Sequence, residues 1–140
     1  MNSFSIITVV YNDKKNIKST INSVINQNYK NFEYIIIDGK STDGTYEIIN
    51  SYKSKKITLV SEKDGGIYDA MNKGINYIKN DWVIFMNSGD LFVSNNSILN
   101  ISKKINNKID LAYGNHINYK NNIIVPISIE NFWKGSFICH

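Results

Sequence analysis

Three carboxylates, Asp38, Asp64 and Asp90, each follow an apolar run of the 140-residue sequence. Asp38 stands in IIIDGKSTDGT, where an acid at the end of a buried strand can accept hydrogen bonds from a ring N–H or a ribose hydroxyl. The alternative is that this stretch is only a turn and a helix cap. The sequence has no GxGxxG and no GxxxxGK[ST], which disfavours a dinucleotide fold or a phosphate loop of those kinds.

Asp64 lies in SEKDGGIYDAMNKGI, at the start of the most amphipathic helix that the sequence predicts. The two glycines after it would let the backbone approach a ligand closely. The polar face of the helix carries Asp69, Asn72 and Lys73. A helix N-terminus favours an anion, although acids in a first turn also simply offset the helix dipole.

Asp90 ends the segment FMNSGD, in which an apolar run stops in a polar turn. Mg²⁺ and Mn²⁺ are often held by one or two protein carboxylates, with substrate phosphates and water in the other positions. One acid is therefore sufficient if the substrate brings a diphosphate. Asn87 and Ser88 would add neutral polar contacts, and the alternative is a turn without a ligand.

Strand-length apolar runs alternate with segments of helical period along the chain. The runs cover 5–11, 32–39, 57–62 and 82–86. The first helical segment would be capped by Asn12 or Asp13, and a later one begins near Ser97. This alternation predicts an α/β fold, a doubly wound and mostly parallel sheet with helices on both faces. Ligands bind such sheets at the carboxyl ends of the strands, so all four polar strand ends should face one crevice.

The length predicts a single domain over residues 1–140. After the predicted helix near Ser97, the segment DLAYGNHINYKNNIIVPISI predicts strands joined by a turn at KNN. If the chain is truncated at its C-terminus, uncovered apolar surface would favour homo-oligomers formed through these strands.

The net charge of +4 comes entirely from lysine, because the sequence has no arginine. The lysines are scattered and not interleaved with aromatic residues, which argues against nucleic acid as a partner. A weak attraction to anionic lipid head groups is compatible with this charge. The one cysteine, Cys139, cannot form an internal disulfide and fits a cytosolic compartment, and the run at 5–11 is too short to span a membrane.

Four motifs, TVVYN, IDGKSTDGT, EKDGGIYDAMNKG and MNSGD, occur in this order at the predicted strand ends. In this order and spacing the sequence resembles the family 2 glycosyltransferases, which have the GT-A fold. The wording IYDAMNKGI and NSGD resembles the bacterial branch that builds capsular, colanic-acid-like or lipopolysaccharide sugars. The resemblance implies a nucleotide-diphospho-sugar donor, often a uridine one, and transfer of its sugar with inversion.

The resemblance also implies roles for residues of the first three motifs. Thr8, Val10 and Tyr11 would line the nucleoside pocket. Asp38 would hydrogen-bond the base, and Asp64 would contact the base or the ribose. These roles come from the family motifs and not from the composition or spacing of this chain.

Asn72 and Lys73 would lie near the nucleotide and donor sugar, by the same resemblance. Asp90 matches the last acid of the family's DxD-type motif and would bind Mg²⁺ or Mn²⁺. Asn87 and Gly89 stand where acids often stand in the family, and this departure puts the affinity for metal in question.

No general base is visible in the sequence. In the family the base is an acid in the acceptor-binding half, beyond the last residue here, and Glu130, His116 and His140 are the late candidates in this chain. The leading hypothesis is a sugar transferase acting on a glycan or lipid-linked acceptor in the cytoplasm, at the inner face of the membrane. The alternatives are a nucleotide-sugar-binding module that needs a partner or a missing segment, and a doubly wound protein with no diphosphate ligand.

Overall fold

The computed structural model describes residues 2–52, 57–106, 108, 116–118 and 123–125. The chain divides into two compact units, Met1–Lys104 and Ile105–His140. All of the residues predicted to bind nucleotide or metal belong to the first unit.

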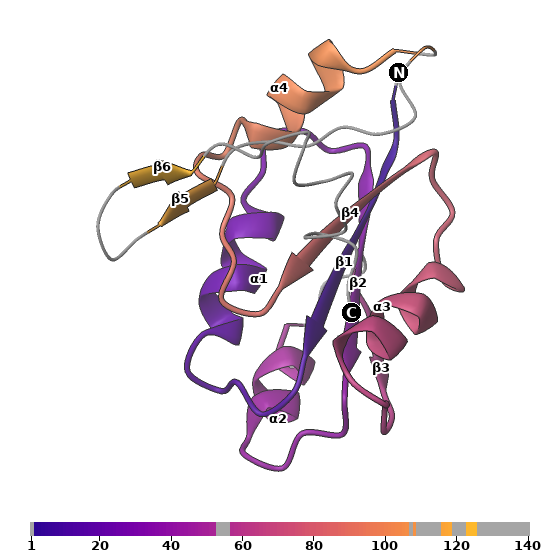
Figure 1. Cartoon of the computed structure of the whole chain (residues 1–140), viewed down its shortest axis with the longest axis vertical. Coiled ribbons are helices and arrows are strands. Elements are labelled where there is room, and N and C mark those ends of the chain that lie inside the picture. Colours follow the sequence, from indigo (N-terminus) through magenta and orange to yellow (C-terminus); the bar gives the residue numbers. More distant parts are fainter. Residues whose placement is uncertain (1, 53–56, 107, 109–115, 119–122, 126–140) are drawn as a thin grey trace. The chain divides into compact units, whose positions relative to one another are not determined.

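A four-stranded parallel sheet forms the centre of the first unit (Figure 1). Its strands are β1 (Phe4–Val10), β2 (Phe32–Asp38), β3 (Ile57–Ser61) and β4 (Trp82–Asn87), in the spatial order β3-β2-β1-β4. β1 is buried along its whole length and β2 along nearly all of it, which explains their continuous rather than alternating apolar pattern. The prediction of a parallel sheet at these positions is confirmed.

Helices cover both faces of this sheet. They are α1 (Ile17–Ile25), α2 (Thr45–Asn50), α3 (Ile67–Ile75) and α4 (Ser97–Lys104). Figure 1 shows α1 and α2 on one side of the sheet and α3 on the other. The chain steps from β1 to β2 to β3 and then returns past β1 to β4, so the strand order reverses between β1 and β4. Doubly wound sheets bind their ligands at such a reversal.

α3 packs very closely on β1 and β2. A Cβ atom added at Gly74 would lie 2.6 Å from Cγ2 of Ile7 and 3.4 Å from Cγ1 of Ile37. Only a residue without a side chain allows the helix backbone to lie this near the sheet. Ala70, one turn earlier on α3, belongs to the same buried core as Ile7 and Ile37.

The opposite face of the sheet contains a buried polar pair. The hydroxyls of Thr8 and Tyr34 lie 2.9 Å apart and are hydrogen-bonded. Burial raises the pKa of Tyr34, so its hydroxyl stays protonated across the physiological range. Further along, the buried Gln27 joins the end of α1 to the start of α4: its Nε2 donates to Ser94 O and its Oε1 accepts from the N–H of Ile98.

The first helix begins later than the sequence predicted. Asn16 is its N-cap, and neither Asn12 nor Asp13 has that role. Asn12 has a left-handed φ of 49°, and its Oδ1 accepts a hydrogen bond from Thr42 in another loop. The predicted cap was wrong because a tertiary contact uses the side chain that a local cap would need.

In the second unit, β5 (His116–Asn118) pairs antiparallel with β6 (Ile123–Val125), which confirms two of the strands predicted there. The predicted turn at 120–122, together with Glu130, Cys139 and His140, lies outside the described residues. Self-association through these strands stays a prediction. Among the described residues, no helix has the length and apolar character that crossing a bilayer requires.

Candidate functional site

The carboxyl ends of the four strands meet at one edge of the sheet because the strands are parallel and level with one another. Val10 of β1 pairs with Asp38 of β2, and Asp38 pairs with Ser61 of β3. On the other side, Val9 of β1 pairs with Asn87, the last residue of β4. The polar residues that end these strands are thereby brought into one row.

Side chains tie the loop after β1 to the loops after β2 and β4. The backbone N–H of Asn12 donates to Ser41 Oγ at 2.8 Å, and Asn12 Oδ1 accepts from the N–H of Thr42 at 2.8 Å. Asp13 Oδ2 accepts a hydrogen bond of 2.7 Å from the Ser88 hydroxyl. These contacts hold Asn12 in a conformation that a residue other than glycine rarely adopts.

A pocket of about 510 Å³ opens at this edge, next to the reversal of strand order between β1 and β4. It is lined by Val9, Val10, Tyr11, Asn12, Asp13, Asp64, Gly66, Ile67, Ala70, Asn87 and Ser88. Cavities for small ligands and cofactors usually measure roughly 300–1,000 Å³, so this pocket has a suitable size.

The pocket separates the predicted site residues into two groups. Those that line it are Val10, Tyr11, Asp64, Asn87 and Ser88. Those outside its lining are Thr8, Asp38, Asn72, Lys73 and Asp90. Both groups lie in the first unit, and the contacts of the second group show what each of its members does in this structure.

Thr8 and Asp38 are fully buried and hydrogen-bonded to protein groups. The Thr8 hydroxyl pairs with Tyr34. The Asp38 carboxylate accepts from the Ser61 hydroxyl at 2.6 Å and from the N–H of Ser41 at 3.2 Å. Asp38 therefore holds the loop after β2 against the end of β3, and its hydrogen bond to a base stays a prediction.

Asp64 reaches the pocket from the loop before α3 and lies against the end of β2. A Cβ atom added at Gly39 would lie 2.6 Å from Asp64 Oδ2 and 3.3 Å from the Tyr11 ring. The other carboxylate oxygen, Oδ1, accepts the N–H of Gly66 at 3.0 Å. The Tyr11 side chain is 64% exposed, so a large aromatic ring is available beside a fixed carboxylate.

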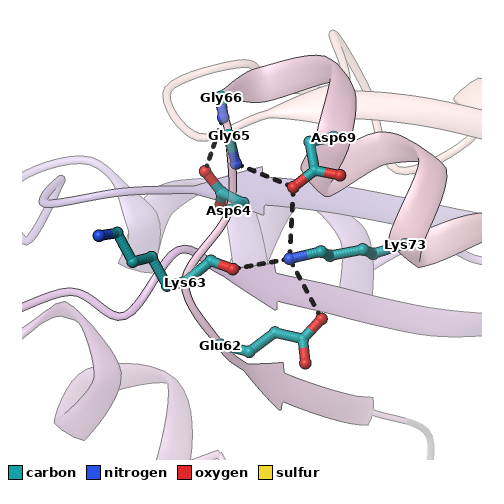
Figure 2. Close-up of polar contacts among 7 residues, drawn as sticks. All are labelled: Glu62, Lys63, Asp64, Gly65, Gly66, Asp69 and Lys73. Atoms are coloured by element: carbon teal, nitrogen blue, oxygen red, sulfur yellow. Dashed lines mark hydrogen bonds and ion pairs between the residues drawn. The ribbon is translucent and has the colours of Figure 1, made fainter.

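Asn72 and Lys73 lie further along α3. Asn72 is exposed on the helix surface. The Lys73 ammonium turns back to the loop before the helix, where it donates to the carbonyl of Lys63 at 2.7 Å and forms ion pairs with Glu62 and Asp69 (Figure 2). In this structure Lys73 thus contacts protein oxygens beside the pocket.

Asp90 closes the turn after β4, where its Oδ2 accepts the N–H of Asn87 at 3.0 Å. Gly89 has a φ of 96°, a conformation that glycine adopts without strain. Asn87 Oδ1 is buried and has no hydrogen-bond partner among the described residues, and an oxygen of this kind is costly unless a ligand or an ion meets it. The oxygens of Asn87 and Asp90 are ligands of the kind that Mg²⁺ and Mn²⁺ prefer.

The charged side chains that line the pocket are negative. Asp13 and Asp64 are the charged side chains of its lining, and no lysine of the described chain belongs to that lining. Within the described residues, no three His, Cys, Asp or Glu side chains gather closely enough to hold a metal ion by themselves. A metal at this edge would therefore depend on oxygens from a substrate as well.

Asp13 lines the pocket, although its place in the sequence predicted only a helix cap. Its carboxylate is hydrogen-bonded to the Ser88 hydroxyl. No local signal identifies this role, because Ser88 lies 75 positions later in the chain.

The sequence matches the family described as Glycosyl transferase family 2 over residues 5–134. The chain belongs to this family. A similar relative is the UDP-Glc:alpha-D-GlcNAc-diphosphoundecaprenol beta-1,3-glucosyltransferase WfgD of Escherichia coli, 32% identical over 122 residues, which are 86% of this chain and 48% of WfgD. The chain thus spans about half the length of this relative.

Solved structures of glycosyltransferases share the fold of most of this chain. TarS 1-349 of S. aureus in complex with UDP-GlcNAc is 25% identical, with a TM-score of 0.67 over 72% of this chain and 30% of TarS. The mannosyltransferase PcManGT of Pyrobaculum calidifontis, solved with GDP-Man and Mn²⁺, is 22% identical, with a TM-score of 0.68 over 73% of this chain and 32% of that protein. The family 2 chain described here has the GT-A fold, as its motifs predicted.

Proposed function

We propose that the first unit binds the nucleotide-diphospho-sugar donor of a glycosyltransferase, with UDP as the nucleotide. The observation that carries this proposal is the pocket at the reversal between β1 and β4, lined by Tyr11, Asp64, Asn87 and Ser88. Two resemblances support uridine: the name of WfgD includes UDP-Glc, and TarS was solved with UDP-GlcNAc.

Each pocket residue would contribute a different contact with the donor. The exposed Tyr11 ring offers a face on which a nucleobase stacks. Asp64, fixed beside it, accepts hydrogen bonds from the N–H of the base or from ribose hydroxyls. Asn87 and Ser88, at the end of β4, lie where the diphosphate would extend toward the turn that carries Asp90.

A divalent cation, Mg²⁺ or Mn²⁺, belongs to this proposal because of the charge of the pocket. A diphosphate is an anion, and the charged side chains in the pocket lining, Asp13 and Asp64, are anions as well. Asp90, with the unpartnered Oδ1 of Asn87, would hold the cation. When bound, the cation supplies positive charge to the departing diphosphate.

The whole protein would transfer the sugar with inversion to a glycan or lipid-linked acceptor, in the synthesis of cell-surface polysaccharide. The acceptor in the name of WfgD is a lipid diphosphate, which supports a lipid-linked acceptor here. A carboxylate or imidazole near the acceptor hydroxyl would take its proton during the attack. Such an acceptor would place the protein in the cytoplasm, at the inner face of the membrane, where its net charge of +4 favours anionic lipid.

Amide chemical shifts during a titration with UDP and Mg²⁺ test the proposed pocket. We expect shifts at Tyr11, Asp64 and Ser88, and none at Lys18 or Tyr52, which line a second pocket between α1 and α2. Shifts confined to the second pocket would contradict the proposed site, and equal shifts with GDP would contradict the proposed nucleotide.

A second candidate function is a module that binds the nucleotide sugar without transferring it. The observation that favours this alternative is that the described acids of the pocket, Asp13 and Asp64, are already hydrogen-bonded to protein groups, Asp13 to Asn16 and Ser88 and Asp64 to Gly66. Neither is thereby set to take a proton from an acceptor. Donor turnover that does not exceed the protein-free rate with any acceptor, despite saturable UDP binding, would support the module and contradict the transferase.

A further inference from the structure

Lys73 joins α3 to the loop that precedes this helix. Its Nζ donates to the carbonyl oxygen of Lys63 at 2.7 Å, and lies 3.3 Å from Glu62 Oε1 and 3.3 Å from Asp69 Oδ2 (Figure 2). One ammonium group thus contacts three oxygens, two of them in the loop and one in the first turn of the helix.

Asp69 extends this network to the glycines of the loop. The same Oδ2 that meets Lys73 accepts the N–H of Gly65 at 2.8 Å. Both contacts lower the pKa of Asp69, the Gly65 N–H more than Lys73, so the carboxylate is charged at neutral pH. Partial burial lowers the pKa of Lys73, but its hydrogen bonds to Glu62 and Asp69 outweigh this effect and leave the pKa raised.

The loop held by this network carries two residues of the donor pocket, Asp64 and Gly66. Asp64 bonds the N–H of Gly66 on one side and lies against Gly39 on the other. Gly66 has a φ of 123°, which few other residues adopt, so the loop makes a sharp turn immediately before the helix. The position of the Asp64 carboxylate therefore depends on how this turn is held.

The charges around Lys73 argue against a direct contact with diphosphate. Its ammonium already faces two carboxylates, Glu62 and Asp69, and it does not line the pocket. To meet a phosphate it would have to leave both partners and the Lys63 carbonyl. A lysine free to bind an anion would lack these competing contacts.

We infer that Lys73 is a positioning residue, which holds the loop of residues 62–66 so that Asp64 meets the nucleoside part of the donor. This inference rests on the proposed function, because it needs a nucleoside in the pocket. It assigns Lys73 to the same pocket that its motif predicted, but through Asp64 and the loop instead of through a contact with the nucleotide.

Titrations with uridine and with UDP distinguish positioning from contact with phosphate. We expect Lys73→Met to weaken the binding of uridine and of UDP by the same factor, about fivefold, because the variant loses the placement of Asp64. Lys73→Arg should restore most of the uridine affinity. A loss of affinity for UDP without a loss of affinity for uridine would overturn the inference. Uridine lacks the diphosphate, so such a result would mean that Lys73 contacts phosphate.

Asp69→Ala tests the network from its other end. If Lys73 positions the loop, this variant weakens UDP binding, as Lys73→Met does. If Lys73 instead binds phosphate, removal of Asp69 frees the ammonium and strengthens UDP binding.

The matched control for Lys73→Met is Lys63→Met, which removes one positive charge from the same loop and leaves its backbone carbonyl in place. We expect the control to stay within about twofold of the unaltered protein.

Amide hydrogen exchange in the ligand-free protein separates this inference from the proposed function. Lys73→Met should speed exchange at Gly65 and Gly66, and Lys63→Met should not. Unchanged exchange would overturn the positioning role even if UDP binds. Faster exchange together with no UDP binding to the unaltered protein would support the positioning of the loop and contradict the proposed donor.

Discussion

At the scale of single residues, the site depends on where a few carboxylates are held. Asp64 lies against a glycine, Asp13 accepts from Ser88, and Asp90 accepts from the backbone of Asn87. Each acid is fixed by a contact with another loop or with its own turn. Substitutions next to these acids should therefore change ligand binding more than they change stability.

Gly39→Ala should displace Asp64 from the pocket. The new methyl group would lie 2.6 Å from Asp64 Oδ2, and a carboxylate at the end of a side chain moves aside more easily than a backbone does. We expect about a fivefold loss of uridine affinity in a calorimetric titration, with the unfolding temperature nearly unchanged. Gly65→Ala is the control, because its methyl group would meet nothing nearer than 3.8 Å. Equal losses in both variants would contradict the role of Asp64.

Asp90→Ala should abolish the effect of Mn²⁺ on UDP binding while the fold persists, because Asp90 is exposed in a turn. Asp81→Ala provides the matched control: Asp81 is an exposed acid at the other end of β4, bonded to the Ser3 hydroxyl. Titrations of UDP with and without Mn²⁺ measure the difference. A metal effect that survives in Asp90→Ala would exclude Asp90 as the ligand.

At the scale of elements, the close approach of α3 to the sheet sets the position of the loop that carries Asp64. We predict that Gly74→Ala destabilises the protein, although alanine favours a helix by about 1 kcal/mol over glycine. Its methyl group would lie 2.6 Å from Ile7 Cγ2, and overpacking of a core usually costs about 1–3 kcal/mol. Urea unfolding measures the balance, with the exposed Asn72→Ala as the control in the same helix. A more stable Gly74→Ala protein would contradict this packing.

The elements themselves were largely predictable from the sequence. β1 and β2 are buried on both faces, so their apolar residues run without interruption. The spacing on α3 matches the buried Ala70 and Gly74, whereas Ile67 and Ile75 are exposed. The start of α1 was predicted wrongly, because Asn12 serves the loop after β2. The fold thus followed from local patterns, except at a residue that a distant segment engages.

At the scale of the whole molecule, low pH should reduce the stability of the first unit through its loop carboxylates. Hydrogen bonds from the Thr45 hydroxyl and the Lys14 N–H lower the pKa of Asp43, and the Gly65 N–H and Lys73 lower that of Asp69, both from 3.8. Their contribution to stability is therefore complete above about pH 3.8 and is lost as the pH falls through the lowered values. In Asp69→Asn, the unfolding temperature should fall less steeply at acid pH, giving a flatter acid limb in a plot of unfolding temperature against pH. An unchanged limb would contradict this linkage.

The candidate site was less predictable than the fold. The motifs indicated the edge of the sheet at which the pocket opens, and five of the predicted site residues line this pocket: Val10, Tyr11, Asp64, Asn87 and Ser88. The contacts of Asp13 and Lys73 could not be read from the sequence, because each depends on how a loop folds back onto its neighbours. A motif locates a site, while the partners of each side chain require the tertiary structure.

In the proposed function, this pocket binds uridine diphosphate with the help of a divalent cation. A calorimetric titration of UDP into the protein, with Mn²⁺ and again with a chelator, measures both the binding and its dependence on the cation. The negative charge of the pocket lining predicts saturable heat with Mn²⁺ and little or none with the chelator. Equal binding in the chelator would contradict the role of the cation, and no binding in either solution would contradict the proposed donor.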